Sequence, residues 1–322
     1  MTNMINLEDY KEMDVATAIF GMYLVDHIEG SNIQVLTADM SVASCLERIK
    51  LQYPDHYTDV GIAEQNMIGI CAGLSNEGFR PMAICQATFI SMRAFEMDRQ
   101  LLGYMNSNVV LLGLHAGFFL QFMGNTHYAT EDIAIMRTIP GLTILSPADA
   151  GEAVMCAKAA LEHVGPVYIR LTGGSTAKTV YPETCDLQIG KDIMLREGKD
   201  VVIFVTGSMV GRTLDAAEIL SENYGIEARV YDVHTLKPKD VESIIASKNF
   251  KLLVSVEEHS VIGGLGSSIS DFTSQEGGYP VLLKLGVQDT FSVVGDYEFL
   301  LEQHRLTAEM IAEDIYLKFR NL

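Results

Sequence analysis

Short apolar runs alternate with amphipathic segments along almost the whole chain of 322 residues, and this alternation constrains the fold more than any other feature. In the first half, strands are predicted at 33–37, 80–85, 109–114, 142–145 and 167–171, and helices at 62–74, 89–105, 131–139 and 149–164. In the second half, strands are predicted at 201–205, 227–233, 252–256 and 281–285, and helices at 210–224, 241–246, 266–273 and from 296 onward. This order predicts an α/β fold with two consecutive, mostly parallel sheets that carry helices on both faces.

The boundary between two domains is predicted from a change in composition. Small and polar residues fill 172–178, which indicates a linker or a crossing loop. A length of 322 residues agrees with two domains, because a domain has roughly 150 residues. We therefore expect a first domain at 1–174, a linker at 175–190 and a second domain at 191–322.

Composition and charge exclude several classes of protein. The chain has 42 acidic and 23 basic residues, a net charge of −19, which argues against binding to nucleic acids or anionic membranes. No apolar run reaches the roughly 20 residues that span a bilayer, and the N-terminus lacks the basic start and apolar stretch of a signal peptide. The five cysteines form no Cys-x-x-Cys pair, so we expect reduced thiols rather than disulfides or a zinc site. These features predict an acidic cytoplasmic protein without a zinc site.

Glu64 stands near the start of an otherwise apolar predicted helix, in the segment 61–67. An acid in the first turn of a helix is common, because it interacts favourably with the helix dipole. The alternative is a carboxyl group kept in an apolar site, where it exchanges a proton with a bound heterocycle. The position alone does not separate these two interpretations.

Phe89, Met92 and Phe95 share one stripe of the helix predicted at 89–105. A stripe of this kind most often packs in the core of a protein. Sulfur atoms and ring edges also suit a pocket for a flat aromatic ligand. Both interpretations stay open at this point.

Two histidines and an arginine lie near the ends of predicted strands. His115 follows the strand at 109–114, and His127 is the one ionisable residue of the loop 124–127 beyond it. Ligands of open parallel sheets bind beyond the carboxyl ends of the strands, and imidazole suits proton transfer near neutral pH, so both histidines are candidates. Arg170 ends the strand at 167–171, where it would suit a phosphate or carboxylate; the alternative is a surface ion pair.

Glu257, Glu258 and His259 precede a run of glycines at 263–266. The run lacks the spacing of a dinucleotide-binding loop or of a P-loop. We expect instead a tight loop that opens a helix and allows a close approach of backbone segments.

Several segments, taken in this order, resemble the C-terminal half of transketolases, and most closely the separate C-terminal subunit of split transketolases. They are the segments 59–67, 115–117, 130–140, 147–150, 165–170 and 257–260, which span nearly the whole chain, and the one around Glu64 is the most specific. The same segments are also similar, less closely, to those of 1-deoxyxylulose-5-phosphate synthase and of the β subunit of 2-oxoacid dehydrogenase E1. The resemblance implies a pyrimidine-binding domain followed by the transketolase C-terminal domain.

The resemblance also implies thiamine diphosphate as the cofactor. Glu64 would then hydrogen-bond the aminopyrimidine ring and promote the tautomer that deprotonates the thiazolium carbon. Phe89, Met92 and Phe95 match hydrophobic positions around the pyrimidine. Asp39 matches an aspartate near the cofactor and the dimer interface.

Residues on the substrate side are carried over in the same way. His127 matches the active-site histidine near the reacting hydroxyl groups. His115 and Arg170 match residues that contact the far, often phosphorylated, end of a sugar substrate. Met123 stands where many relatives have a carboxylate that contacts the hydroxyl groups of the donor.

Apolar residues gained in this region indicate an unusual substrate. Phe118, Phe119, Phe122 and Met123 make the expected pocket more apolar than in many relatives. We expect a substrate other than the usual pentose phosphates, either a less hydroxylated donor, such as a 2-oxoacid, or a bulkier acceptor, such as a nucleotide-linked keto-sugar. The sequence does not identify the donor or the acceptor.

The family's diphosphate-binding signature, Gly-Asp-Gly followed by an asparagine, is absent. The one Gly-Asp pair of the chain, Gly295 and Asp296, is followed by Tyr297. A partner chain, the N-terminal transketolase subunit, is therefore expected to hold the diphosphate with Mg²⁺ or Ca²⁺. The active site would lie at the interface, in a heterotetramer of two large and two small subunits, and this chain would also associate with itself through that interface.

The leading hypothesis is the small subunit of a transketolase-like enzyme that transfers a ketol or acyl unit to an aldehyde or ketone acceptor. A first alternative is the β subunit of an E1-type 2-oxoacid decarboxylase. A second is a non-catalytic structural partner, although the presence of both Glu64 and His127 weighs against it.

Overall fold

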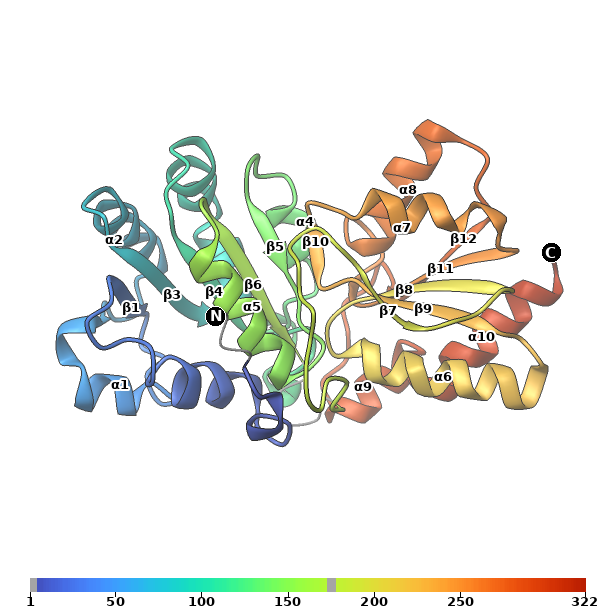
Figure 1. The fold of residues 1–322 in the computed structure, drawn as a ribbon, viewed down its shortest axis with the longest axis horizontal. Helices are drawn as coiled ribbons and strands as arrows, with labels where there is room; N and C mark the ends of the chain where they lie inside the picture. Colours follow the sequence, from blue (N-terminus) through green and yellow to red (C-terminus); the bar gives the residue numbers. More distant parts are fainter. Residues whose placement is uncertain (1–4, 173–177) are drawn as a thin grey trace.

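The computed structural model describes residues 5–172 and 178–322, which form two α/β domains side by side (Figure 1). Residues 173–177, which include the start of the linker predicted at 175–190, lie outside the described residues. Within the described ranges, no helix is long and apolar enough to cross a membrane.

The first domain is built on a sheet that, within the described ranges, has seven strands in the order β10-β5-β6-β4-β3-β1-β2. Its strands are β1 (Ile33–Thr37), β2 (Tyr57–Asp59), β3 (Arg80–Gln86), β4 (Val110–Ala116), β5 (Thr143–Leu145), β6 (Val167–Thr172) and β10 (Thr235–Lys237). All neighbouring pairs are parallel except β10 with β5. β10 comes from the second half of the chain, so both halves contribute to this sheet.

The second sheet has five strands in the described part of the chain, in the order β12-β11-β8-β9-β7. These are β7 (Ile193–Arg196), β8 (Val201–Val205), β9 (Ala228–Asp232), β11 (Leu252–Ser260) and β12 (Leu282–Val287), and only β7 runs antiparallel to its neighbour. Two mostly parallel sheets confirm the predicted α/β class. The pattern missed β2, β7 and β10, because such short strands leave no clear periodicity.

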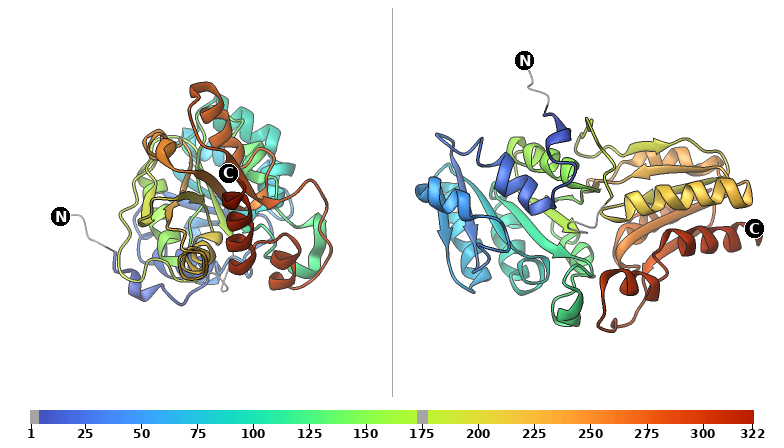
Figure 2. Two further views of the ribbon diagram at one scale, coloured as in Figure 1. Left: turned by 90° about the vertical axis from the view of Figure 1, so that its right-hand side faces the viewer. Right: turned by 90° about the horizontal axis from the view of Figure 1, so that it is seen from below.

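Helices and shorter helical turns (η) cover both sheets (Figures 1 and 2). In the first domain they are η1 (Leu7–Asp9), η2 (Thr17–Tyr23), α1 (Glu47–Gln52), η3 (Pro54–His56), α2 (Glu64–Asn76), η4 (Phe89–Arg93), α3 (Phe95–Met97), η5 (Asp98–Tyr104), η6 (Gln121–Thr126), α4 (Asp132–Met136) and α5 (Ala150–Glu162). In the second they are α6 (Met209–Tyr224), α7 (Val241–Ala246), η8 (Ser247–Asn249), α8 (Leu265–Glu276), α9 (Tyr297–Gln303) and α10 (Ala308–Arg320). In Figure 1, α7 and α8 lie on one face of the second sheet, and α6 and α10 on the other.

Two predicted helices are interrupted. The helix predicted at 89–105 is divided into η4, α3 and η5, because Ala94 leaves helical geometry and because η4 and η5 wind as π-helices. The helical segment from 296 onward is divided into α9 and α10, and Arg305 between them has a positive φ of 58°. A π-helical turn contains more residues than an α-helical turn, so the predicted regular stripe of side chains is altered in the first case.

Side chains of the first sheet alternate between two apolar layers, as expected for strands buried on both faces. In β3, Met82 and Ile84 belong to one layer, and Ala83 and Cys85 to the other. The layer of Ala83 continues into the second domain, where it includes Phe204. One apolar cluster therefore joins the two domains.

A buried carboxylate, Glu258, also joins the domains. Its Oε1 accepts the backbone N–H of Phe118 over 2.6 Å, and its Oε2 accepts hydrogen bonds from Ser208 Oγ at 2.6 Å and from the Tyr297 hydroxyl at 2.7 Å. Gly117 lies against this carboxylate so closely that a Cβ atom there would overlap Oε1. The three donors compensate for the loss of water around the charged group.

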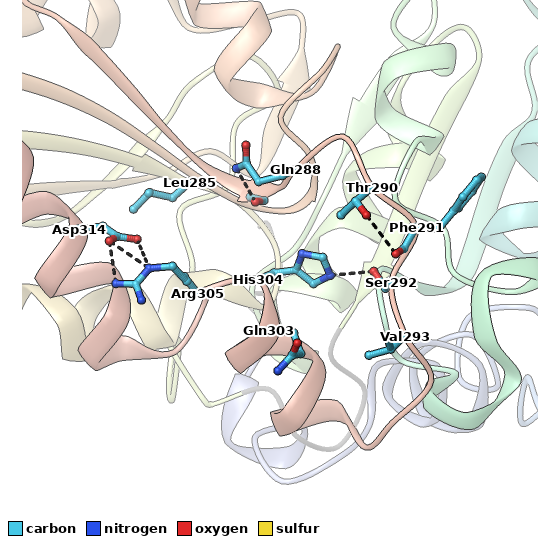
Figure 3. Close-up of a pocket in the computed structure, with 11 residues that line it drawn as sticks. Leu285, Gln288, Thr290, Phe291, Ser292, Val293, Gln303, His304, Arg305 and Asp314 are labelled. Atoms are coloured by element: carbon cyan, nitrogen blue, oxygen red, sulfur yellow. Dashed lines mark hydrogen bonds and ion pairs between the residues drawn. The ribbon is translucent and has the colours of Figure 1, made fainter.

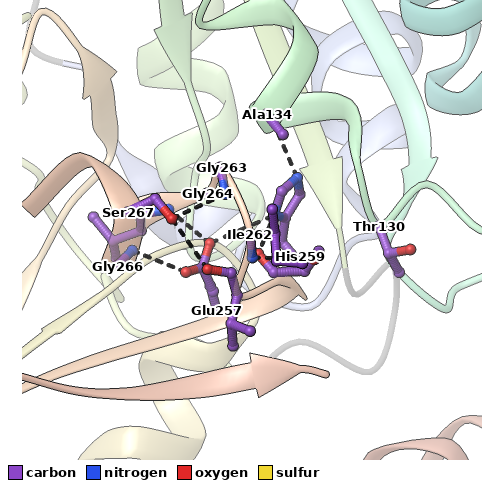
Figure 4. A network of polar contacts seen from close by, with 12 residues as sticks. Thr130, Ala134, Glu257, His259, Ile262, Gly263, Gly264, Gly266 and Ser267 are labelled. Atoms are coloured by element: carbon purple, nitrogen blue, oxygen red, sulfur yellow. Dashed lines mark hydrogen bonds and ion pairs between the residues drawn. The ribbon is translucent and has the colours of Figure 1, made fainter. Parts of the chain in front are cut away.

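The glycine-rich loop after β11 forms a second polar junction (Figure 4). Glu257 accepts the backbone N–H groups of Leu265 at 2.7 Å and Gly266 at 2.9 Å, and so caps the start of α8. His259 Nε2 accepts the N–H of Ala134 from the first domain over 3.3 Å. A Cβ atom at Gly264 would overlap the Glu257 carboxylate, which confirms the predicted tight loop that opens a helix.

A third buried group contains two acids that no cation neutralises in the described structure. Burial raises the pKa of Asp232 to about 7. Burial, followed by the charge of Asp232, raises the pKa of Glu152 well above its usual range. The hydroxyl of Tyr181 donates to Asp232 Oδ2 over 2.7 Å, and the backbone N–H of Ala148 donates to Glu152 over 2.6 Å. Burial therefore favours the protonated form of both acids.

The wild-type protein should lose stability as the pH rises from about 4 to 7. We expect this loss to be smaller in Asp232→Asn. An unfolded chain releases the Asp232 proton near the ordinary aspartate pKa of 3.8, whereas the folded chain keeps it until about pH 7. The folded state thus binds more protons in this window, and its stability falls as the pH rises. The melting temperature of the variant relative to wild type should increase by a few degrees between pH 4.5 and pH 7.5.

Asp186→Asn, at an exposed position, is the matched control and should leave the pH dependence unchanged. Parallel stability curves for wild type and Asp232→Asn would contradict the prediction.

Candidate functional site

Glu64 is the first residue of α2, and its side chain is only 3% exposed. Its Oε1 accepts a charged hydrogen bond from Arg93 Nη1 over 2.7 Å and lies 3.7 Å from Cys85 Sγ. The start of α2 carries the positive end of the helix dipole, which also favours the carboxylate. Glu64 is thus a first-turn acid and a buried carboxyl group at once, so the two interpretations of the sequence do not exclude each other.

Arg93 connects Glu64 to two other candidate residues. Its guanidinium carbon lies 4.2 Å from the centre of the Phe89 ring, and that ring meets His127 edge to face with centroids 5.4 Å apart. Glu64, Arg93, Phe89 and His127 therefore form one continuous row of contacts. Arg93 was not predicted from the sequence, although its spacing four residues after Phe89 was a usable signal.

Met92 and Phe95 lie in the same interrupted helical segment. Both are half-buried, and Phe95 packs against the apolar layer that joins the two domains. Their proposed contact with a pyrimidine ring stays a prediction.

His127 is fixed by the residues beside it. Thr88 Oγ1 donates to the backbone carbonyl of His127 over 2.7 Å, and Thr126 Oγ1 lies 2.8 Å from His127 Nδ1. Because Thr88 immediately precedes Phe89, the turn after β3 and the loop that carries His127 are held together.

A loop of the second domain packs on the segment that carries His127. Asn125 Nδ2 donates to the carbonyl of Ser292 over 2.6 Å, and Asn125 Oδ1 accepts the N–H of Ser292 over 3.0 Å. Gly124 has a φ of +74°, and Val294 lies against it. The second domain therefore helps to shape the candidate site, although its pairing partners are more than 160 residues away in sequence.

His115 is the second-last residue of β4 and has a left-handed backbone conformation, with a φ of +58°. Its ring stacks on Phe119 at a centroid distance of 4.7 Å. Nδ1 is buried and has no hydrogen-bond partner in the described residues. Burial lowers the pKa of His115 to about 4, so the ring is neutral at pH 7. The ring borders a small cavity of about 30 Å³ that Asp14 also lines. These features suit a contact with substrate, which stays a prediction.

Arg170 lies in the interior, with 1% of its surface exposed, and not at an open site. Nε lies 3.0 and 2.9 Å from the two carboxylate oxygens of Asp132, and Nη2 donates to the carbonyl oxygens of Ala129 and Glu258 at 3.1 and 2.8 Å. Neither the phosphate contact nor the surface ion pair considered from the sequence describes this arrangement, because β6 is a central strand covered on both faces. Arg170 instead holds Ala129 and Glu258 in place.

The remaining candidates differ in their exposure. Asp39 is exposed after β1 with a φ of +58°. Met123 and Phe122 are 54% and 71% exposed on η6. Phe118, expected to line the substrate pocket, is fully buried and stacks on His304 with a centroid distance of 5.0 Å. Of these apolar residues, Phe122 and Met123 are therefore the ones available at the surface.

A larger cavity, of about 460 Å³, lies in the second domain (Figure 3). It is lined by the loop after β12, by the end of α9 and by Asp314 of α10, and none of the sequence-predicted site residues lines it. In residues 5–172 and 178–322, no group of three or more His, Cys, Asp or Glu side chains is arranged to hold a metal ion.

Two family models match consecutive parts of the chain. The model for "Transketolase, pyrimidine binding domain" matches residues 13–178, which is about half of the chain and includes all the sequence-predicted site residues. The model for "Transketolase, C-terminal domain" matches residues 190–311.

Three relatives resemble the chain over most of its length. A transketolase C-terminal section of Methanocaldococcus jannaschii is 38% identical over 88% of this chain and 89% of its own length. The 6-deoxy-6-sulfo-D-fructose transketolase subunit of a Clostridium species is 39% identical over 87% of this chain and 86% of its own length. An apulose-4-phosphate transketolase subunit of Actinobacillus succinogenes is 31% identical over 88% of this chain and 91% of its own length.

Solved structures agree with these matches. A structure described as "Split gene transketolase, inactive beta4 tetramer" superimposes with a TM-score of 0.84 at 37% identity, over 96% of this chain and 98% of that chain. Transketolase from Pichia stipitis shares the fold, with a TM-score of 0.74 at 19% identity, over 98% of this chain and 46% of that longer chain.

We expect Asn125→Ala to loosen the loop that carries His127. The substitution removes two hydrogen bonds to Ser292, each worth about 1 kcal/mol, so amide hydrogen exchange in 121–127 and 288–295 should accelerate several-fold. Hydrogen exchange followed by mass spectrometry measures this change. Asn66→Ala, at an exposed position on α2, is the control. Equal exchange rates in both loops for wild type and Asn125→Ala would contradict the coupling.

Proposed function

This chain belongs to the transketolase family, and we propose that it is the C-terminal subunit of a split transketolase that transfers a ketol unit with thiamine diphosphate. The observation that carries the proposal is the buried Glu64 carboxylate at the start of α2, inside the matched pyrimidine-binding domain, with Phe89 and His127 in the same row of contacts. The active site is shared with a separate N-terminal subunit.

The residues around Glu64 fit an aminopyrimidine ring. The Glu64 carboxyl group offers a hydrogen-bonding edge and Phe89 offers an aromatic face, and the planar guanidinium of Arg93 contacts both at once. When bound, thiamine diphosphate supplies the carbon nucleophile and the electron sink of the reaction. Glu64 holds or moves a proton at its carboxyl oxygens, and Phe89, Met92 and Phe95 supply apolar surface for the ring.

His127 is proposed to exchange a proton with the hydroxyl groups of a sugar substrate. Thr126 engages Nδ1 at 2.8 Å, and this leaves Nε2 for a substrate. Imidazole is suited to this step because it gains and loses a proton near neutral pH. The hydrogen bond from Thr88 holds the backbone of His127 in place while the proton moves.

The partner subunit is proposed to hold the diphosphate together with Mg²⁺ or Ca²⁺. The sequence of this chain lacks the Gly-Asp-Gly signature that binds this group in the family. Two of the similar proteins are named as subunits, which supports a complex of two chain types, and we propose two copies of each. Away from its partner, we propose that the chain associates with itself.

The substrate is proposed to differ from the usual pentose phosphates. Met123 and Phe122 place exposed apolar surface on η6, four and five residues before His127. Such surface favours a donor with fewer hydroxyl groups, such as a 2-oxoacid, or a bulkier acceptor, such as a nucleotide-linked keto-sugar. Ketol transfer from ordinary sugar phosphates at rates typical of metabolic enzymes, measured with the reconstituted pair, would argue against this substrate class.

Glu64→Gln, in complex with the N-terminal subunit, is expected to lower kcat at least about a hundredfold. An amide cannot take up and release the proton that general acid–base catalysis requires. Turnover is measured with a panel of ketose phosphates and 2-oxoacids as donors. Glu77→Gln, at an exposed position just after α2, is the control and should keep the wild-type rate. Similar turnover in the two variants would refute the catalytic role of Glu64.

Binding of thiamine diphosphate is expected to require both subunits. Isothermal titration with Mg²⁺ present should give a Kd for the complex at least about a hundredfold lower than for this chain alone, because charge-assisted contacts to the diphosphate come from the partner. Tight binding by the isolated chain would contradict a shared site.

A further inference from the structure

Arg93 contacts both groups that would hold a flat heterocycle in the proposed site. Its Nη1 donates to Glu64 Oε1 over 2.7 Å, and its guanidinium carbon lies 4.2 Å from the centre of the Phe89 ring. A guanidinium is planar, and its N–H donors lie in that plane, so it pairs with a carboxylate through its edge and with an aromatic ring through its face. An aminopyrimidine likewise has hydrogen-bonding groups along its edge and a flat face that stacks on an aromatic ring.

The two members of the ion pair differ strongly in burial. The side chain of Glu64 is 3% exposed, whereas that of Arg93 is 46% exposed. Arg93 is also the one ion-pair partner of Glu64 within the described part of the chain. The guanidinium therefore reaches the buried carboxylate from the solvent side, where an incoming ring would meet it.

The backbone of Arg93 is anchored, but its side chain has room to move. Gln65 Nε2 donates to the Arg93 carbonyl over 3.1 Å, and the residue closes η4. Rotation about the side-chain torsions alone moves the guanidinium away from Glu64, and exposed side chains make such rotations within nanoseconds. No helix or strand has to change for the carboxylate to become available.

We propose that Arg93 competes with the aminopyrimidine ring of thiamine diphosphate for Glu64 and Phe89, so that the guanidinium must swing away before the ring is seated. This inference rests on the proposed function. Arg93 keeps the buried carboxylate paired, since an unpaired buried charge is costly. Because it occupies the contacts that the ring needs, it also lowers the affinity and the rate of cofactor binding.

The test uses the complete complex of this chain with its N-terminal subunit, freed of cofactor by dialysis against a chelator. The Kd for thiamine diphosphate with Mg²⁺ is measured by isothermal titration, and the association rate by stopped flow. Arg93→Ala should bind the cofactor about tenfold more tightly, which corresponds to about 1.4 kcal/mol, and should associate faster. Arg93→Lys should fall between this variant and wild type, because an ammonium pairs with Glu64 but does not stack flat on Phe89.

Arg99→Ala, at an exposed position of η5, is the matched control and should bind like wild type. Unchanged or weaker cofactor binding by Arg93→Ala would overturn the competition and would instead make Arg93 a residue that helps to hold the ring. If Arg93→Ala fails to fold, the direction of the change in Arg93→Lys decides in the same way. Loss of binding in all complexes, wild type included, would overturn the proposed function itself.

Discussion

The buried carboxylate of Glu258 fixes the junction between the two domains, and the candidate site depends on that junction. Its three hydrogen-bond donors come from both domains, and Arg170 donates to the Glu258 carbonyl as well as to that of Ala129. Ala129 follows His127 by two residues and pairs with Gly117, which follows His115 by two residues. The position of both histidines is therefore tied to a single buried charge and to the glycine that accommodates it.

Several acidic side chains of this chain are buried, and the cost of removing water from each is offset in a different way. Asp132 is paired with Arg170 in the interior. Glu257 accepts backbone N–H groups at the start of α8, whereas Asp232 keeps a proton to about pH 7. Glu64 differs from these, because its cation is half-exposed on one side while the carboxylate itself is buried. A binding site for a nitrogen heterocycle requires a carboxylate that can exchange its present hydrogen-bond partner for the ring.

The chain supplies one side of the proposed active site. The row from Glu64 to His127 offers a proton-exchanging carboxyl group, an aromatic face and an imidazole, and its one guanidinium, that of Arg93, is paired with Glu64. The described residues hold no group of three or more His, Cys, Asp or Glu side chains arranged for a metal ion. The proposed N-terminal partner would carry the groups that bind the diphosphate, and this would also account for an acidic chain acting on an anionic cofactor. The exposed apolar residues of η6, Phe122 and Met123, lie close in sequence to His127, where they would influence the choice of substrate.

The sequence by itself determined the α/β class and the long buried strands, because periodicity depends on neighbours along the chain. The family resemblance named Glu64, Phe89 and His127 as candidates. Only the tertiary structure decided which of these residues meet. The packing of η4 against α2 places Arg93 in contact with both Glu64 and Phe89. Arg170 is an interior residue rather than a surface contact because β6 is central in its sheet. Contacts between residues that are distant in sequence leave no periodic signal. The burial of these side chains and the identity of their contact partners therefore follow only from the tertiary structure.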